Sequence, residues 1–234
     1  MSARYAIYWA PAPSSPWWVW GSRWLGRDEI LDQPLPQDEV PGISAEELHN
    51  ATALARRYGW HATSKAPFHL ADGANVHALW QAVHALAATV SPIALGPMRL
   101  TELEGFLALT CDPVPEALLT LAARCVVELD GLRAPLSEAD LMRRRMDRLD
   151  ARGRELVRRF GYDRVLERFI WHVTLCDRLP PDRLALLRAH LEPGVARLNA
   201  GSPLVLDRLS LFVEPSAGAP LRRLDDVRLA GVKE

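Results

Sequence analysis

The feature that most constrains the fold is a short pattern that occurs twice. It stands once in "RRYGWHATSKAPFHL" at 56–70 and again in "RFIWHVTLCDRL" at 168–179. Each copy has an aromatic residue, then Trp, His, any residue and Thr. On a β-strand the His and the Thr point to one face, while the Trp and the middle residue point to the other. The chain is therefore expected to place two equivalent strands side by side, each anchored in a core by its apolar face.

The remaining sequence alternates between strand-like and helix-like segments. We expect strands at 4–11, 93–103, 105–112, 204–214 and 222–230, and helices at 44–55, 73–90, 115–129, 137–160 and 181–192. Ser44 and Ser137 are the expected N-caps of two of these helices. The order strand, helix, strand, strand, helix recurs in both halves. It predicts an α+β protein with two similar lobes, forming one domain over 1–234 with a helical insert around 130–162.

Composition narrows the kinds of partner. The chain has 234 residues, 49% of them hydrophobic and 24% charged, which is ordinary for a globular protein with a sizeable core. Its net charge of −1 provides no overall field that attracts nucleic acid or a membrane surface. We therefore expect a small-molecule partner, with nucleic acid disfavoured, and any bound anion must be held by a local cluster.

Cysteine usage and hydropathy indicate a compartment. Cys111, Cys125 and Cys176 are odd in number and form no Cys-x-x-Cys pair, which is typical of a reducing environment. The N-terminal segment lacks the apolar core of a signal peptide, and no apolar run reaches the roughly 18 residues that span a bilayer. The sequence therefore predicts a cytoplasmic protein without a membrane segment.

The doubled motif offers two imidazoles and two hydroxyls to one groove. One neutral His can take a proton from an attacking water or hydroxyl, and a second, protonated His can give one to the leaving oxygen. The Thr hydroxyls can donate hydrogen bonds to the non-bridging oxygens of a phosphate. Lys65, two residues after Thr63, is expected on the same face, where it could offset negative charge. This combination suits phosphoryl chemistry without a metal.

The doublet resembles the signature of the two-histidine (2H) phosphoesterase superfamily, whose members carry His-x-Thr/Ser twice. Further segments resemble the branch of that superfamily associated with bacterial phosphonate-degradation operons. They are "RYAIYWAP", "WLGRD", "RRYGWHATSKAPF", "GFLAL", "LRAPLS" and "RFGYDRVLERFIWHVTL", spread over 4–175.

The resemblance implies a bilobal α+β fold, in which two pseudo-symmetric lobes with antiparallel sheets line a central cleft. It implies a metal-independent hydrolase, without cofactor, that opens a cyclic phosphodiester. For the phosphonate branch it suggests a small ribose cyclic phosphate such as phosphoribosyl 1,2-cyclic phosphate.

Site residues follow from the motif and from the branch-like segments. The resemblance assigns His61 and His172 to catalysis and Thr63 and Thr174 to substrate binding. Further expected substrate contacts are Lys65, Tyr58, Arg133, Arg27 and Tyr162. Because Cys176 stands where the first copy has Lys65, the cleft is expected to be asymmetric, but the sequence does not say which His is the acid.

Other groups allow more than one interpretation. Arg143, Arg144 and Arg145 predict either a solvated helix face or a phosphate clamp above the cleft. The tryptophans at 17, 18, 20 and 24 indicate core packing, a lid, or a wall for a sugar or base ring.

Two further chemistries are not expected. Cys176 shares the motif face but lies roughly 13 Å along the strand from His172, too far for activation as a nucleophile. His61, His69 and His172 lack a carboxylate or Cys at ligand spacing, so no metal site is expected.

Three alternatives stay open at this point. The chain could be a 2′,3′-cyclic phosphodiesterase acting on RNA ends or nucleotides. It could be a binding module for a phosphosugar or nucleotide that retains the cleft without catalysis. The motif histidines could also be two core residues with satisfied hydrogen bonds. The sequence does not define an oligomeric state.

Overall fold

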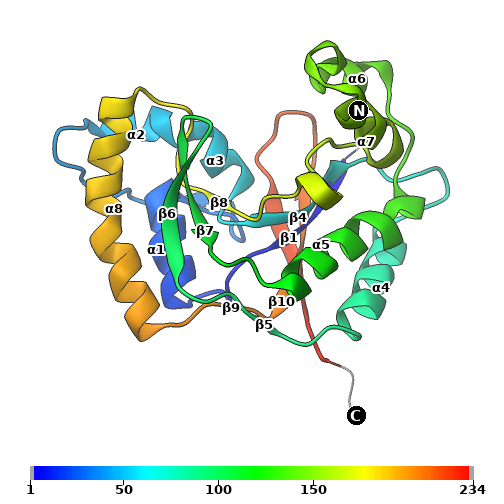
Figure 1. Ribbon diagram of the computed structural model, residues 1–234, viewed down its shortest axis with the longest axis horizontal. Helices are drawn as coiled ribbons and strands as arrows, with labels where there is room; N and C mark the ends of the chain where they lie inside the picture. Colours follow the sequence, from blue (N-terminus) through cyan, green and yellow to red (C-terminus); the bar gives the residue numbers. More distant parts are fainter. Residues whose placement is uncertain (1–2, 232–234) are drawn as a thin grey trace.

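One seven-stranded sheet organises the chain (Figure 1), as seen in a computed structural model that describes residues 3–231. The strand order is β11-β10-β1-β4-β8-β7-β6, and every neighbouring pair is antiparallel. The strands are β1 (Arg4–Trp9), β4 (Ala62–Phe68), β6 (Met98–Leu103), β7 (Phe106–Cys111), β8 (Val173–Thr174), β10 (Arg208–Glu214) and β11 (Arg222–Arg228). Two short ladders, β2 (Arg27–Asp28) with β3 (Gln33–Pro34) and β5 (Ile93–Ala94) with β9 (Val205–Leu206), lie outside it. The protein is thus α+β with a large antiparallel sheet, as the sequence predicts.

Helices pack around this sheet. They are α1 (Pro16–Leu25), α2 (Ala45–Ala51), α3 (Ala53–Tyr58), α4 (Val76–Ala87), α5 (Glu116–Glu128), α6 (Glu138–Arg143), α7 (Ala151–Phe160) and α8 (Pro181–Gly201), with 3-10 turns η1 (Asp130–Leu132), η2 (Met146–Arg148) and η3 (Leu166–Arg168). Buried residues of α1, α4, α5 and α8 join Ile7 and Trp9 of β1 in one hydrophobic cluster. The opposite face of β1 and β4 is not covered by this cluster. It has α3 on one side and α6 and α7 on the other (Figure 1).

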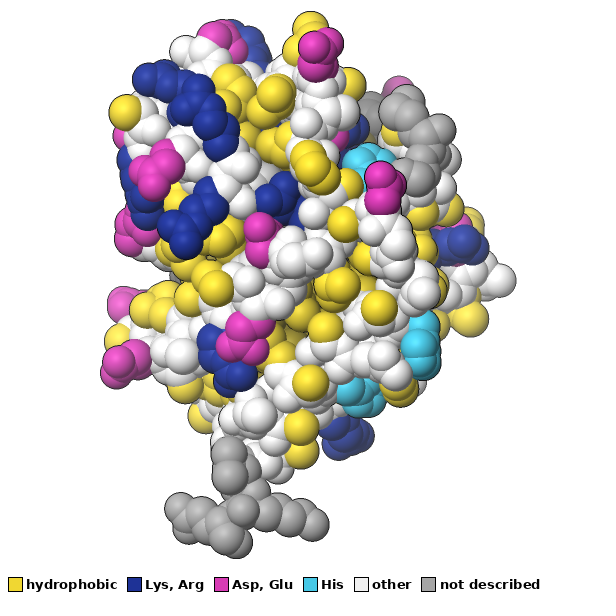
Figure 2. Space-filling view, turned by 90° about the vertical axis from the view of Figure 1, so that its right-hand side faces the viewer, with side chains coloured by type: hydrophobic (Ala, Val, Ile, Leu, Met, Phe, Trp, Pro, Cys, Tyr) yellow, Lys and Arg dark blue, Asp and Glu magenta, His cyan; other side chains and the backbone are white. Residues whose placement is uncertain are grey.

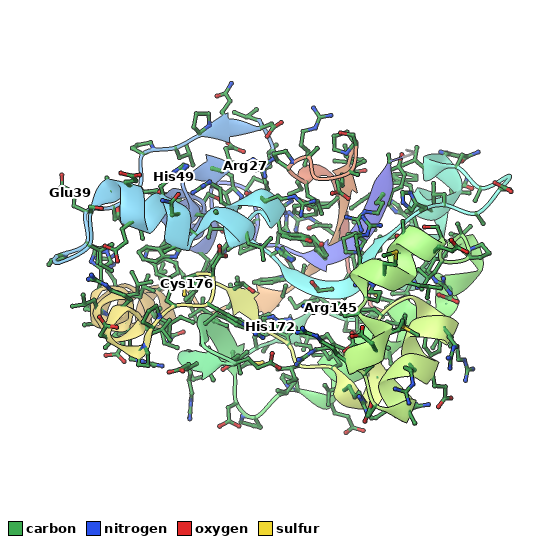
Figure 3. The ribbon with its side chains drawn as sticks, turned by 90° about the horizontal axis from the view of Figure 1, so that it is seen from above. Arg27, Glu39, His49, Arg145, His172 and Cys176 are labelled. Carbon is green, nitrogen blue, oxygen red and sulfur yellow. The ribbon has the colours of Figure 1, made fainter. Side chains whose placement is uncertain are left out.

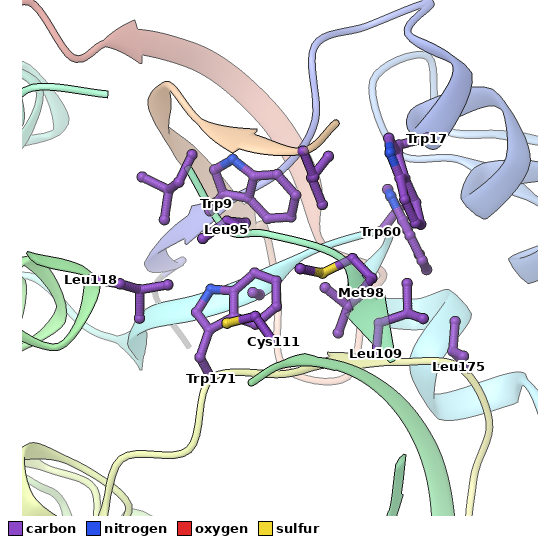
Figure 4. Packing of buried hydrophobic residues seen from close by; sticks show 14 of the residues in the cluster. Trp9, Trp17, Trp60, Leu95, Met98, Leu109, Cys111, Leu118, Trp171 and Leu175 are labelled. Carbon is purple, nitrogen blue, oxygen red and sulfur yellow. The ribbon is translucent and has the colours of Figure 1, made fainter. Parts of the chain in front are cut away.

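The Trp of each motif copy anchors its strand in this core. Trp60 and Trp171 are buried, and the ring of Trp171 lies 5.6 Å from that of Trp9 (Figure 4). Trp17 and Trp24 of α1 are buried too, and the Trp24 indole donates to the Leu175 carbonyl at 2.7 Å, just past the second motif. The core interpretation of the N-terminal tryptophans is therefore right for these two residues.

The expected N-caps are present, but the long charged helix is broken. Ser44 Oγ accepts from the Glu47 amide at 3.1 Å, and Ser137 forms a capping box with Asp140. The single helix expected over 137–160 is wrong, because Arg145 adopts a left-handed φ of 47° and Asp150 caps a new helix, α7. A left-handed residue cannot continue a right-handed helix.

The second motif strand is much shorter than expected. The sequence predicts a strand over 168–179, but only Val173–Thr174 forms β8, and η3 precedes it. Beyond β8 the Leu175 amide still donates to the Leu107 carbonyl at 2.9 Å, after which the chain turns toward α2. The last helix is longer than expected and continues past Pro193 to Gly201. Within residues 3–231, no helix combines the length and the apolar character needed to cross a membrane.

Candidate active site

The two motif strands are neighbours at the middle of the sheet. Ala62 of β4 pairs with Val173 of β8 in antiparallel register, and both face the helical core. The same register places His61 opposite Thr174 and Thr63 opposite His172. All four of these side chains line one cavity of about 580 Å³ on the open face of the sheet. The structure thus brings together the four residues that the motif predicts.

Both imidazoles are held in the same tautomer. His61 Nδ1 lies 2.9 Å from the Gly59 carbonyl, and His172 Nδ1 lies 2.8 Å from the Ile170 carbonyl. A carbonyl only accepts, so Nδ1 carries the proton and Nε2 is left to act on a ligand. Gly59 is required here, because its φ is +81° and an added Cβ would come 2.8 Å from the Glu29 side chain.

Burial makes both imidazoles weak bases. Burial is the main reason that the pKa of His61 is lowered to about 4. The bond to Gly59 acts in the opposite direction, and the neighbouring His172 adds a smaller lowering effect. Burial also lowers the pKa of His172, with Arg164 acting in the same direction and Glu104 in the opposite one. Without a ligand, both rings are therefore neutral at pH 7.

Aromatic rings distinguish the two histidines. The Tyr8 ring stacks on His61 at 3.9 Å between centroids. The Tyr58 ring lies 6.0 Å from His61, with an angle of 30° between the two ring planes. Among the aromatic rings of residues 3–231, His172 contacts only the tilted ring of Phe106, 5.9 Å away between centroids. In a view from above, His172 lies near the middle of the molecule (Figure 3). The site is therefore symmetric in its motif and asymmetric in its surroundings.

The cleft wall carries further polar groups from both sides. Tyr58 and Tyr162, both expected from sequence, line the cavity. Arg144, Arg164, Arg178 and Glu104 line it too. Glu104 accepts from Arg164, and from Arg178 at 2.7 Å. The rest of the wall is largely apolar and includes Leu54, Phe106, Phe169 and Ile170.

Lys65 does not reach the cleft, contrary to the sequence prediction. Tyr8 pairs with Thr63 but Ile7 pairs with Lys65, so Ser64 is an extra residue in a β-bulge. The bulge reverses the alternation and turns Lys65 to the helical side. There its ammonium donates to the Val126 carbonyl at 2.9 Å and to Asp130 at 3.1 Å.

Substituting Lys65 therefore tests stability rather than chemistry. We expect Lys65→Met to lower the free energy of unfolding by about 2–3 kcal/mol, because it removes two hydrogen bonds from a buried charge and leaves Asp130 to Arg133 alone. Urea unfolding checks this. Arg99→Met, which breaks the exposed pair with Asp112, is the control and should change stability by less than about 0.5 kcal/mol. Unchanged stability with lost turnover would instead return Lys65 to the cleft.

Two arginines expected at the site are structural, and neither lines the cleft. The buried Arg27 binds Asp32 and donates to the carbonyls of Arg56, Arg57 and Leu221. Arg133 binds Asp130 and donates to the carbonyls of Ala134 and Arg159. Each ties separate segments together, so the predicted ligand contacts are wrong for both.

Cys176 is also turned away from the motif face. Strand β8 ends at Thr174, so the strand alternation does not extend to Cys176. The Cys176 side chain is fully buried, and its Sγ accepts from the Leu107 amide at 3.3 Å. In Figure 3 it lies nearer to α8 than His172 does. Burial raises the pKa of this thiol to about 11, so it is not a nucleophile.

Sequence reasoning missed Tyr8, Arg164 and Arg178. Tyr8 sits in the first strand, where period-two alternation puts it on the face opposite Ile7, so its side could have been predicted but not its contact with His61. Arg164 follows Tyr162 by two residues in the branch-like segment. Across residues 3–231, the structure has no cluster of three or more His, Cys, Asp or Glu suited to a metal ion.

The sheet and the cleft define an α+β protein with a two-histidine site built on adjacent antiparallel strands. The chain belongs to the family described as "Protein of unknown function (DUF1045)", whose model matches residues 63–222.

Two curated relatives share this sequence at 39% identity. One, from Janthinobacterium sp. (strain Marseille), aligns over 99% of this chain and 52% of its own length. The other, from Laribacter hongkongensis (strain HLHK9), aligns over 94% of this chain and 50% of its own length. Both are named "Ribose 1,5-bisphosphate phosphokinase PhnN". The chain thus spans about half the length of these relatives.

A solved structure resembles the chain only distantly. It is the crystal structure of a conserved protein of unknown function, ATU0111, from Agrobacterium tumefaciens strain C58. The match covers 98% of this chain and 87% of that one, with a TM-score of 0.39 and 11% identity.

Proposed function

We propose that this chain is a metal-independent 2H phosphoesterase that opens a small ribose cyclic phosphodiester by His–His acid–base catalysis. The observation that carries the proposal is the antiparallel pairing of β4 with β8. It gives one cavity two imidazoles with fixed Nδ1 protons and a hydroxyl opposite each. The bilobal form of the 2H fold belongs to this proposal, with β4 and β8 as the seam between the lobes.

The surroundings favour distinct roles for the two histidines. His61, stacked on Tyr8 and with its pKa near 4, is the proposed base that takes a proton from water. His172, whose surroundings include both Arg164 and the Glu104 carboxylate, is the proposed acid that protonates the leaving sugar oxygen. Thr63 and Thr174 donate to the non-bridging oxygens. One P–O bond forms with water oxygen and one P–O bond to the ring breaks, leaving a phosphate monoester and a sugar hydroxyl.

The relatives' name supports the substrate class. The name PhnN agrees with the phosphonate-associated branch that the sequence resembles, and ribose 1,5-bisphosphate is the compound it mentions. Opening phosphoribosyl 1,2-cyclic phosphate at the bond between phosphorus and O2 yields ribose 1,5-bisphosphate. The proposed product is therefore the compound that the relatives are named for phosphorylating.

We assign the kinase activity in the relatives' name to the half of their length that this chain does not span. A nucleotide-dependent kinase of the P-loop type needs G-x-x-x-x-G-K-[S/T]. In this sequence neither lysine, Lys65 or Lys233, follows a glycine, so the motif is absent. The half that this chain represents is proposed to supply the bisphosphate rather than to phosphorylate it.

A second candidate is a 2′,3′-cyclic phosphodiesterase for RNA ends. Arginines gather over α6 and α7 beside the cleft, and Figure 2 shows Lys and Arg side chains collected on that upper part of the molecule. A basic surface next to a cyclic phosphate site suits a polyanion. Acidic side chains are interspersed there, and several of the arginines are paired with them.

The first test is turnover in EDTA, followed by phosphorus NMR. We expect phosphoribosyl 1,2-cyclic phosphate to open to a monoester at the same rate with and without the chelator. A 2′,3′-cyclic nucleotide should open far more slowly. A strict metal requirement would contradict the mechanism. Opening of the nucleotide alone would favour the RNA candidate, and no reaction with either compound would favour a binding module.

A further inference from the structure

Arg144 differs from the other arginines of the cleft wall in its pairing. Arg164 and Arg178 both bind Glu104, and the adjacent Arg143 binds Asp140. Within residues 3–231, Arg144 forms no ion pair, although it is half-buried and lines the cavity. Its guanidinium carbon lies 4.8 Å from the centre of the Tyr162 ring. A guanidinium withdrawn from water without an anion is costly, so a ligand anion is the natural partner.

The local backbone explains why Arg144 can face the cleft. It follows the last residue of α6 and precedes Arg145, whose left-handed φ of 47° ends the helix and redirects the chain. Cation–π contact with Tyr162 then fixes the guanidinium plane without neutralising its charge. The donors of Arg144 therefore stay available to a ligand in the cavity.

Neighbouring groups add positive charge and a hydroxyl donor. The hydroxyl of Tyr58 accepts from Arg57 at 3.4 Å, which leaves its own proton to donate. Arg57 and Arg4 share one carboxylate, that of Glu214. Arg4 and Tyr58 also lie near enough to act on the charge of Arg144.

The charges around Tyr58 leave a positive surplus. Arg4 and Arg57 share the buried carboxylate of Glu214 and do not themselves line the cavity. With Arg144 included, these three arginines and one carboxylate have a net charge of +2. Asp163 also acts on Arg144, but it is beyond ion-pair distance and does not line the cavity. Counting it leaves a surplus of one. The net charge is positive in either count, so this end of the cleft favours an anion.

The geometry points to a second phosphate subsite formed by Arg144, Tyr58 and Tyr162, which holds a phosphate monoester of the substrate. Resting on the proposed function, it specifies a substrate that carries a terminal monoester besides its cyclic diester. One cavity of about 580 Å³ contains both the histidines and Arg144, so one sugar can extend between them. A cyclic phosphate without the second phosphate leaves Arg144 without its anion.

Two substrates that differ only in the second phosphate test this subsite. They are ribose 1,2-cyclic phosphate with and without a 5-phosphate. Wild-type protein should show the higher kcat/KM for the phosphorylated compound. Arg144→Met, which keeps most of the side-chain bulk and removes the charge, should lower the ratio of the two kcat/KM values about 30-fold. An equal loss with both compounds, or an unchanged ratio, would overturn the subsite.

The neighbouring residue provides the matched control. Arg143→Met removes an arginine from the same turn, but one that is exposed and already paired with Asp140. In this variant, the ratio of kcat/KM with the 5-phosphate to kcat/KM without it should stay within about twofold of the wild-type ratio. A loss as large as that of Arg144→Met would show that the general charge of α6 is responsible, and it would contradict a defined subsite.

Binding of ribose 5-phosphate separates this inference from the proposed function. Calorimetry should show binding to wild type that weakens at least tenfold in Arg144→Met, whether or not either cyclic compound is hydrolysed. Absence of hydrolysis together with this difference would reject the catalytic proposal and keep the subsite. Equal binding to both proteins would reject the subsite even if hydrolysis is fast.

Discussion

Replacing either motif histidine with asparagine should lower kcat/KM for opening the ribose cyclic phosphate about 10³-fold. The asparagine side chain is short and its amide can donate a hydrogen bond to the carbonyl of Gly59 or Ile170, but it has no counterpart of Nε2. His61→Asn therefore removes the proposed base, and His172→Asn the proposed acid, with little change in the cleft. Initial rates measured by phosphorus NMR, with circular dichroism as a check on folding, provide the measurement.

The double variant gives a sharper result than either single one. Because acid and base act in one step, His61→Asn with His172→Asn should be only slightly slower than the worse single variant. His77→Asn is the control, since His77 is an exposed residue of α4 beside Trp80 and lies outside the cleft wall. Near-normal activity in either single motif variant would contradict the mechanism.

The pH dependence of kcat/KM should have its maximum in the acid range, below 6.5. The active form needs neutral His61, whose pKa is about 4, and protonated His172, whose pKa is lowered from 6.5. Raising the pH removes the acid proton from His172, so kcat/KM falls tenfold per unit. At pH 8 it should be roughly 30-fold or more below its maximum. Lowering the pH below 4 protonates His61 and removes the base.

The alkaline fall of kcat should occur at a higher pH than the alkaline fall of kcat/KM. A bound phosphodiester anion favours the imidazolium form, so the pKa of His172 rises in the complex. Steady-state kinetics between pH 4 and 9 with one buffer series checks both profiles. In the residual activity of His172→Asn, the fall on the alkaline side should be absent. A kcat/KM that increases steadily through pH 7 would exclude this acid–base pair, because exchanging the two roles would leave the shape of the profile unchanged.

Much of the fold follows from local patterns in the sequence. Alternation identifies most of the long strands, and helical spacing places α4 and α5 within a few residues of their bounds. The same patterns mistake the segment 137–160 for one helix, because apolar and charged spacing does not reveal the left-handed turn at Arg145. They also predict β8 too long. The length of this strand depends on how far β4 and β7 pair with Val173 and Thr174, which the sequence of the segment itself does not show.

In the candidate site, too, residues with a local sequence signal could be predicted, whereas residues placed by strand pairing or distant contacts could not. His61, Thr63, His172 and Thr174 are recognisable because the signal is local and repeated. Lys65 is misplaced because one extra residue, Ser64, reverses the alternation, and a bulge depends on how β1 pairs with β4. The structural roles of Arg27 and Arg133 depend on carbonyls far away in the chain, which no single segment reveals. Tyr8 meets His61 only through strand pairing.

The bonds that hold Nδ1 of each histidine also affect the proposed catalytic cycle. With both Nδ1 atoms donating to carbonyls, each ring exchanges its mobile proton through Nε2 alone. After one turnover His61 is protonated and His172 is neutral, which is the state suited to closing the ring again. Before the next forward step, His61 must therefore lose a proton to bulk water and His172 must gain one from it. In this cycle the product faces a site prepared for the reverse reaction until that exchange is complete.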